Sequence, residues 1–262
     1  MKACILRSSF FALLIAIAAS RADAVAYTAT ILQPPGYLQT QATGSASANQ
    51  AGWGHVNGGG YETHALLWSG TPASAIDLNP TGYSYSFIYG ASGANQIGYA
   101  SVTGTGRYHA VLWNGAAASA IDLHPDGFAQ SFGYGISDTS QVGYGEAFAD
   151  GFHHALLWNG TAASAIDLQP SGVVYSDAWG VSGSKQVGFG FGPSTAGDEH
   201  AFLWSGTAAS VVDLNPAGYV TSQAIGISGS VQVGNAAATN DYQHAIVWHG
   251  TATSAVDLNP TG

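Results

Sequence analysis

The sequence has 262 residues, a formal net charge of −10 at pH 7 and few charged side chains, which make up 8% of the chain. Nucleic acids and anionic membranes are poor partners, because phosphate-rich surfaces need clustered cations and the chain has only five lysines and arginines. A single cysteine excludes an intramolecular disulfide, and seven tryptophans with thirteen tyrosines argue for a packed core.

Residues 1–24 have the pattern of a secretory signal peptide. Lys2 and Arg7 precede an apolar run over residues 10–19, and Ala22-Asp23-Ala24 supplies a small-residue cleavage site. The run is too short to span a bilayer, so we expect no membrane span, although an uncleaved anchor is the competing interpretation. We therefore expect export of residues 25–262 to the cell surface, the periplasm or the medium. This part keeps two basic and fourteen acidic residues, a net charge of −12.

Five copies of one motif follow at nearly constant spacing. Each copy has His-Ala, two apolar residues and Trp, and an aspartate stands nine residues after the tryptophan. A fixed period is the signature of a repeat architecture. The histidines and aspartates are His64 and Asp77, His109 and Asp122, His154 and Asp167, His200 and Asp213, and His244 and Asp257. The predicted units are residues 37–82, 83–127, 128–172, 173–218 and 219–262.

Each unit contains four short apolar or alternating segments separated by turn residues. In the second unit we expect strands at residues 85–89, 96–101, 109–113 and 118–123, with the repeated Gly-x-Ser segments as turns. Four strands in 44–46 residues match a β-propeller blade, which has about 40–50 residues. The sequence therefore predicts an all-β fold, a propeller-like array of five four-stranded antiparallel units.

An additional strand is expected at residues 26–36, ahead of the five units. Residues 30–36 align with the end of the first unit, residues 76–82, so the chain holds six fourth-strand segments but five copies of the other three. We expect a six-bladed ring that lacks part of its last blade, and hence a fragment of a longer protein. In the alternative, five blades close on themselves and the N-terminal strand competes with residues 252–258 for one edge.

The unit varies in length only between its second and third strands. The distance from the Gln-x-Gly glycine to the next repeat histidine is 10, 11 or 12 residues, whereas the other spacings are constant. Variable loops on a fixed scaffold are typical of binding surfaces. Our candidate ligand-binding residues are the carboxylates Glu62, Glu146, Asp150, Glu199 and Asp241. The same stretches hold His55, Tyr61, Tyr108, Phe148, Phe152, His153, Phe191 and Tyr242.

The repeated histidines, aspartates and tryptophans are interpreted as structural. An active site is needed once, whereas a scaffold contact is needed in every unit. We expect each aspartate to cap the turn after the fourth strand through backbone amides, and each tryptophan to lie in the core. No catalytic motif and no Cys/His metal cluster is present in the sequence, so we assign no catalytic residues and no metal ligands. Calcium bound by loop carboxylates is the one cofactor considered.

The five motifs, with His200-Ala201-Phe202 as the literal form, resemble the HAF family of probable extracellular repeats in exported bacterial proteins. The resemblance covers residues 30–262, and four copies carry Leu, Val or Ile at the third position. It implies an extracellular repeat protein and brings no established activity or catalytic residues.

Two functions remain open from the sequence. The first is a binding or surface-structural module whose variable loops engage a glycan, an extracellular polymer or a protein. The alternative is a propeller-type polysaccharide hydrolase or lyase with loop carboxylates, which needs two non-repeated carboxylates close together.

Overall fold

The structure, a computed structural model, describes residues 28–58, 60, 62–239 and 242–260. The predicted signal peptide, residues 26 and 27 of the predicted N-terminal strand and the candidate Asp241 lie outside the described residues. Within the described ranges, no helix is long and apolar enough to cross a bilayer.

The described chain forms five four-stranded antiparallel sheets, each with its strands side by side in chain order. The first sheet has β1 (Tyr37–Ala46), β2 (Asn49–Val56), β3 (Thr63–Trp68) and β4 (Ile76–Asp77). The second has β5 (Tyr83–Ser92), β6 (Asn95–Val102), β7 (Tyr108–Trp113) and β8 (Ile121–Asp122). The third has β9 (Phe128–Ser137), β10 (Ser140–Ala147), β11 (His153–Trp158) and β12 (Ile166–Asp167). The fourth has β13 (Tyr175–Ser182), β14 (Lys185–Phe191), β15 (His200–Trp204) and β16 (Val212–Asp213). The fifth has β17 (Thr221–Ser228), β18 (Val231–Ala237), β19 (His244–Trp248) and β20 (Val256–Asp257).

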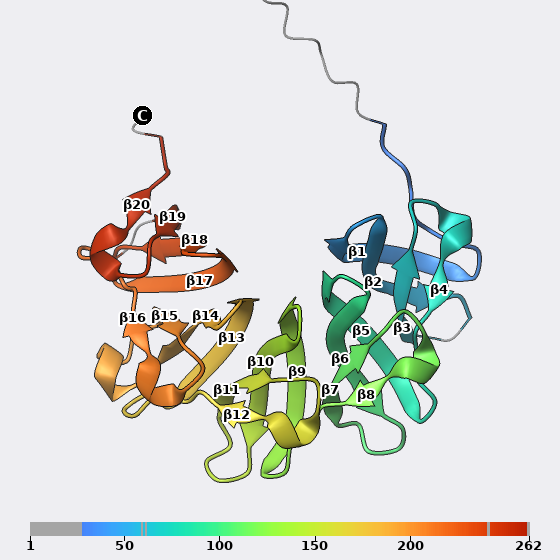
Figure 1. The fold of residues 1–262 in the computed structure, drawn as a ribbon, viewed down its shortest axis with the longest axis horizontal. Coiled ribbons are helices and arrows are strands. Elements are labelled where there is room, and N and C mark those ends of the chain that lie inside the picture. The colour runs from blue at the N-terminus through green and yellow to red at the C-terminus, as the bar shows by residue number, and fades with distance from the viewer. Residues whose placement is uncertain (1–27, 59, 61, 240–241, 261–262) are drawn as a thin grey trace, which may run out of the picture.

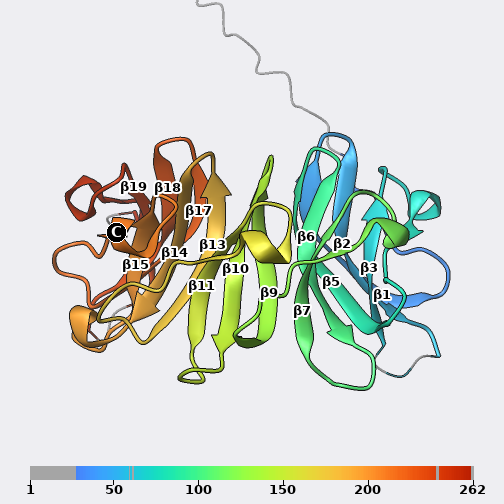
Figure 2. The ribbon, with the colours of Figure 1, turned by 60° about the horizontal axis from the view of Figure 1, so that its bottom comes forward.

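The five sheets stand around an arc. Figure 1 shows the first strands, β5, β9, β13 and β17 among them, on the inner side of the arc, and the fourth strands on its outer rim. Figure 2 shows the same sheets standing side by side in a tilted view. This radial arrangement of four-stranded sheets is that of propeller blades. The predicted all-β, propeller-like array of five antiparallel units is therefore confirmed.

The fourth strand of each sheet is shorter than predicted. In the second unit the strand expected at residues 118–123 covers only Ile121–Asp122, because a 3-10 turn, η2 (Ala117–Ser119), precedes it. The Ser119 hydroxyl accepts the Asn114 N–H at 2.8 Å and donates to the Ala116 carbonyl at 2.6 Å, which closes this turn. The matching turns are η1 (Pro72–Ser74), η3 (Ala162–Ser164), η5 (Ala208–Ser210) and η6 (Ala252–Ser254), while η4 (Pro193–Thr195) lies between β14 and β15.

The glycine of the Gln-x-Gly segment is explained by a close approach of the backbone. The register of β5 against β6 shifts between Ile88 and Gly90, which is a β-bulge. A Cβ atom at Gly98 would lie 1.8 Å from the carbonyl oxygen of Phe87, so only glycine fits there. The prediction that the Gly-x-Ser segment forms a turn is wrong. β5 continues through this segment to Ser92, beyond the bulge.

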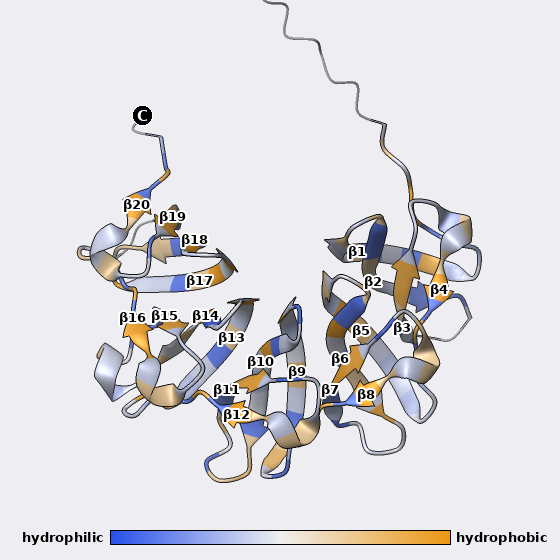
Figure 3. Ribbon diagram, viewed as in Figure 1, coloured by the Kyte–Doolittle hydropathy of each residue, from blue (hydrophilic) through white to orange (hydrophobic). Residues whose placement is uncertain are grey.

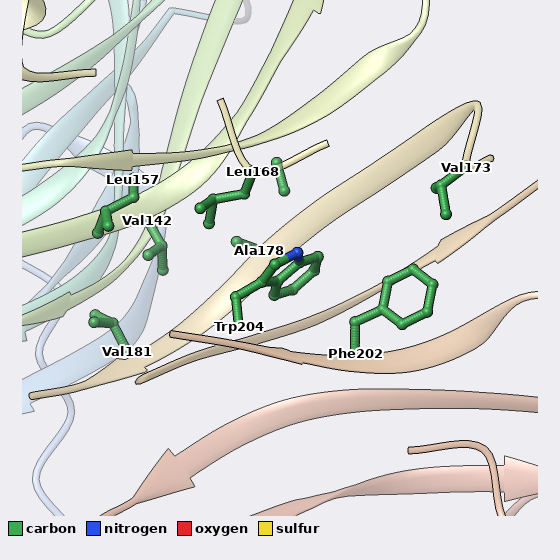
Figure 4. Packing of buried hydrophobic residues seen from close by; sticks show 9 residues of the cluster. Val142, Leu157, Leu168, Val173, Ala178, Val181, Phe202 and Trp204 are labelled. Carbon is green, nitrogen blue, oxygen red and sulfur yellow. The ribbon is translucent and has the colours of Figure 1, made fainter. Parts of the chain in front are cut away.

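Neighbouring sheets pack face to face through apolar side chains. Between the third and fourth sheets, Leu157 and Leu168 from one side meet Ala178 and Trp204 from the other, and all four are at most 5% exposed. Figure 4 shows this cluster with the Trp204 ring at its centre. The five repeat tryptophans are each at most 1% exposed, which confirms their predicted place in the core. Burying such large side chains is the main source of stability available here.

Single hydrophobic residues also reach the outer rim. Figure 3 shows β8, β16 and β20 coloured as hydrophobic, and Ile121, Val212 and Val256 in these strands are 38–50% exposed. Scattered exposed apolar residues are normal on a protein surface and need no ligand to explain them.

A buried serine links each of the first four sheets to the next. The Ser131 hydroxyl, at the start of the third sheet, accepts the Ala110 N–H of the second sheet at 2.9 Å and is fully buried. Ser86, Ser176 and Ser222 make the same contact at the other three boundaries, at 2.9–3.0 Å. Each bond pairs a backbone donor that would be costly to leave unpaired inside the core.

The two ends of the array lie apart in Figure 1, so the expected alternative of five blades closed on themselves is wrong. The face of the fifth sheet that points away from the fourth sheet is accordingly not covered by a described sheet. Val233 and Leu258 are 45% and 56% exposed, whereas Val187 and Leu214, their equivalents in the fourth sheet, are fully buried. The Ala245 N–H pairs with Asn259 Oδ1 at 3.2 Å instead of with a serine from a further sheet.

The described residues 28–36 do not form the predicted N-terminal strand. In the five sheets the fourth strand exists only by pairing with the third strand of its own unit, and no described strand lies beside this segment. The alignment with residues 76–82 nevertheless holds in detail. Gln33 Nε2 donates to the Tyr37 carbonyl at 3.0 Å as Asn79 Nδ2 does to that of Tyr83 at 3.2 Å.

Candidate functional site

The repeated histidines and aspartates pair within each unit. His109 Nδ1 lies 2.7 Å from Asp122 Oδ2, and the other four pairs have the same geometry at 2.6–2.8 Å. The second oxygen of each aspartate accepts the backbone N–H two residues further on at 2.8 Å, that of His124 in the case of Asp122. The predicted turn-capping role of the aspartates is confirmed, and the histidine adds a link between the third and fourth strands.

In the first unit, the pKa shifts of the His64–Asp77 pair agree with its structural role. The hydrogen bond to Asp77 raises the pKa of His64 above its usual value. Burial works to raise the pKa of Asp77, but the hydrogen bonds from His64 and Asn79 outweigh it, so this pKa lies below its usual value. Each partner thus stabilises the charged form of the other in the folded state.

The predicted loop carboxylates do not converge on one point. Glu62 lies 3.5 Å from His64 Nε2, and Asp150 lies 3.2 Å from His154 Nε2, so each joins the His–Asp pair of its own unit. Glu146 accepts from Gln130 Nε2 at 2.9 Å, and Glu199 from Gln223 Nε2 at 2.8 Å. The contacts of these four described residues therefore supply no carboxylate pair of the kind that a two-carboxylate hydrolase needs.

A continuous group of aromatic rings lies on the first and second strands of the first four sheets. Tyr99 of β6 contacts Phe132 of β9 with ring centroids 4.9 Å apart, and Tyr134 stacks on Trp179 of β13 at 4.8 Å with planes 7° apart. We call this group the inner aromatic belt. Its members are Trp53, Phe87, Tyr89, Tyr99, Phe132, Tyr134, Tyr144 and Trp179, all partly exposed.

Three tyrosines of the inner aromatic belt, Tyr99, Tyr134 and Tyr144, stay protonated at neutral pH. Burial is the main cause that raises the pKa values of Tyr99, Tyr134 and Tyr144 above the usual value. Their hydroxyls are therefore neutral hydrogen-bond donors and acceptors next to ring faces. Rings with polar tips are the side chains that proteins use where a surface is half apolar and half wet.

Two of the variable loops reach the inner aromatic belt at their C-terminal ends. The residue before each repeat histidine is not repeated: it is Thr63, Tyr108, His153, Glu199 or Gln243. Tyr108 contacts Tyr99 with centroids 5.4 Å apart, and His153 stacks on Tyr144 at 4.0 Å with planes 12° apart. His153 and Tyr108, which we predicted as loop residues, thus reach the belt.

One polar cluster at the boundary between the third and fourth sheets is not repeated. His153 Nδ1 lies 3.2 Å from Asp177 Oδ1, and the Tyr175 hydroxyl donates to Asp177 Oδ2 at 2.8 Å. Asp177 is 3% exposed. The sequence interpretation missed Asp177, although a signal exists: three residues before the repeat glycine, the other units have Gln41, Phe87, Phe132 and Gln223.

The surface grooves also follow the repeat. A groove of about 380 Å³ lies between Pro80 and Asp122, and a smaller one of about 240 Å³ lies at the equivalent place between Pro216 and Asp257. Because they recur at the unit boundaries, we assign these grooves to the scaffold.

No group of three His, Cys, Asp or Glu side chains suited to a metal ion occurs among the described residues. Calcium binding by the loop carboxylates stays an untested expectation, and Asp241 is not described.

Comparisons with known proteins place the fold and leave the function open. No known protein family and no curated protein sequence matches this chain. Among solved structures, the S511A mutant of puromycin hydrolase complexed with PGG is similar, with a TM-score of 0.58 and 10% identity over 82% of this chain and 37% of that one. The putative TolB from Agrobacterium tumefaciens gives a TM-score of 0.54 and 13% identity over 77% of this chain and 78% of that one.

TolB from Acinetobacter baumannii has a TM-score of 0.54 and 10% identity over 85% of this chain and 55% of that one. The chain therefore spans about a third of the puromycin hydrolase and about half of this TolB. At such identities the likeness concerns the fold alone: the protein is an all-β array of the propeller class.

Proposed function

We propose that the protein is an exported binding module that holds a glycan on the inner aromatic belt. The observation that carries this proposal is the continuity of the belt, whose ring contacts run from Trp53 in the first sheet to Trp179 in the fourth. A polymer of rings with apolar faces and hydroxyl edges matches a surface of partly exposed aromatic rings and tyrosine hydroxyls.

The charge of the chain narrows the ligand class. Residues 25–262 carry a net charge of −12 with Arg107 and Lys185 as the only lysine or arginine side chains. Polyanions would meet repulsion almost everywhere on such a surface. The proposed ligand is therefore a neutral glycan rather than an acidic one. Export rests on the pattern of residues 1–24, and the resemblance to the HAF repeats agrees with it.

The test is binding of purified residues 25–262 to an array of neutral and acidic glycans. We expect neutral glycans to bind, and Tyr89→Ala to weaken binding at least about fivefold by removing a ring from the belt. Tyr89→Phe keeps the ring and should bind nearly as the native protein does. Phe148→Ala is the matched control, because Phe148 is a loop aromatic that is 63% exposed and outside the belt. Selective binding of acidic glycans, or no binding, would contradict the proposal.

A further inference from the structure

The pair His153–Asp177 shares its Nδ1 contact and a tyrosine donor with repeated pairs such as His109–Asp122, but it differs from them in its place in the fold. Its residues are 24 apart and come from different sheets, whereas the repeated pairs are 13 apart within one unit. Asp122 caps a turn through the His124 N–H and has a side chain that is 44% exposed. Asp177 lies inside β13, caps no turn and has a side chain that is 5% exposed.

The fold does not require a carboxylate at position 177. The second and third units have Phe87 and Phe132 at the equivalent position, where they pack in the inner aromatic belt. Burying a charged group costs free energy, and a hydrophobic residue of similar volume is often at least as stabilising. The hydrogen bonds from Tyr175 and His153 offset the free-energy cost of burying the Asp177 carboxylate. They do not show that the fold requires an aspartate at this position.

The contacts fix both the tautomer and the orientation of His153. A carboxylate accepts hydrogen bonds, so Nδ1 of neutral His153 carries the proton that points at Asp177, and Nε2 is left as an acceptor. The ring lies between Tyr144, at 4.0 Å, and Tyr175, at 4.6 Å between centroids. The side chain is 30% exposed, and no partner for Nε2 is found among the described residues. This geometry lets Nε2 accept a hydrogen bond from a ligand.

We propose that His153 Nε2 accepts a hydrogen bond from a hydroxyl of a neutral saccharide bound on the inner aromatic belt, with Asp177 as the positioning residue. The inference rests on the proposed function and assigns the polar end of the same site. The surroundings agree with a neutral, hydroxyl-bearing ligand. Glu146 is the register partner of His153 across β10 and β11, and Glu199 is close enough to Tyr175 to help raise its pKa, after burial and Asp177. An anionic ligand would meet these carboxylates.

The test compares His153→Phe and Asp177→Asn with Asp122→Asn by calorimetric titration of residues 25–262 with cellohexaose and hexa-N-acetylchitohexaose, two neutral oligosaccharides. His153→Phe keeps a stacking ring and removes the acceptor, so we expect affinity to fall about tenfold with little change in Tm. Asp177→Asn should weaken binding to a similar extent. Asp122→Asn should lower Tm and leave affinity unchanged, because its pair belongs to the scaffold.

A second readout needs no ligand. The ¹⁵N shifts of the His153 ring should report the neutral tautomer with the proton on Nδ1, and Asp177→Asn should redistribute that tautomer. A proton found on Nε2 in the native protein would overturn the inference. Native binding that depends on Tyr89 but not on His153 or Asp177 would overturn it and leave the proposed function intact. Failure of the native protein to bind either oligosaccharide would count against both.

Discussion

The repeated pair His109–Asp122 and the unrepeated pair His153–Asp177 contain the same two residue types, but the first lies within the second unit and the second joins the third unit to the fourth. In the first, Asp122 accepts from His109 at 2.7 Å and from the His124 N–H at 2.8 Å, and so joins two strands and a turn of one unit. In the second, Asp177 joins His153 to Tyr175 across a sheet boundary, beside the inner aromatic belt. The same two residue types therefore have a structural role where the pair is repeated, and we assign a binding role to the one pair that is not repeated.

The largest expected effect concerns the free energy of unfolding, which should depend on whether a repeated leucine is covered by a neighbouring sheet. Leu214→Ala should lower the free energy of unfolding by about 2–5 kcal/mol, because Leu214 is fully buried against the fifth sheet. Leu258→Ala, at the equivalent place on the uncovered face, should cost less than about 1 kcal/mol. Urea denaturation of both variants measures the difference. Equal losses would mean that the fifth sheet is covered in solution.

The repeated aspartates should behave as structural residues. Asp122→Ala removes the cap of a turn and the partner of His109, so we expect a loss of about 1–2 kcal/mol in unfolding free energy. Glycan binding should not change, because Asp122 lies on the outer rim of the second sheet. Normal stability with abolished binding would make Asp122 a functional residue and would break the comparison.

The smallest expected effect is a dependence of stability on pH. His64 and His154 have raised pKa values in the folded protein, so their contribution is full below pH 6.5 and is lost as the pH rises through those values. Burial lowers the pKa of His124, beside His109, so its contribution is full above pH 6.5 and is lost below it. Asp77, with a lowered pKa, loses its contribution only as the pH falls below 3.8. We therefore expect Tm to be highest near pH 6.5.

His124→Asn isolates one part of this profile. The first and fourth units have Asn79 and Asn215 at the same position, so asparagine is compatible with the local structure. Asn215 also keeps the hydrogen bond from the buried serine, Ser222, at 2.8 Å. The variant should lose the decline in Tm between pH 6.5 and 5, a change of about 1–3 °C, measured by differential scanning calorimetry. An unaltered acid limb would show that His124 does not titrate in this range.

Much of the scaffold could be predicted from the sequence because the repeat carries it. The spacing between Trp113 and Asp122 located the third and fourth strands, and the recurrence of the His–Asp pairs indicated their structural role. The length of β8 was wrong because Ser119 closes a 3-10 turn that strand patterns do not reveal. The N-terminal segment was assigned to a strand because alignment with residues 76–82 cannot show whether a partner strand is present.

The candidate site could be predicted only in part. The loop carboxylates were chosen by position, yet Glu62 and Asp150 contact the repeat histidines of their own units. The inner aromatic belt is formed by residues from different sheets, such as Tyr99 and Phe132, whose contact depends on how the sheets pack. Asp177 was hidden inside a strand, and only its departure from the uncharged residues at this position in the other units, glutamine or phenylalanine, marks it.

The most direct test of the account is Asp177→Phe, which installs the residue that the second and third units carry at this position. If repeated positions build the scaffold and Asp177 acts at a binding site, the unfolding free energy should change by no more than about 1–2 kcal/mol, since the removal of a buried charge offsets the loss of two hydrogen bonds and the larger volume of phenylalanine. Binding of cellohexaose or hexa-N-acetylchitohexaose should fall about tenfold, because His153 loses its orienting partner. Unimpaired binding together with a large loss of stability would contradict the account and would place Asp177 in the scaffold.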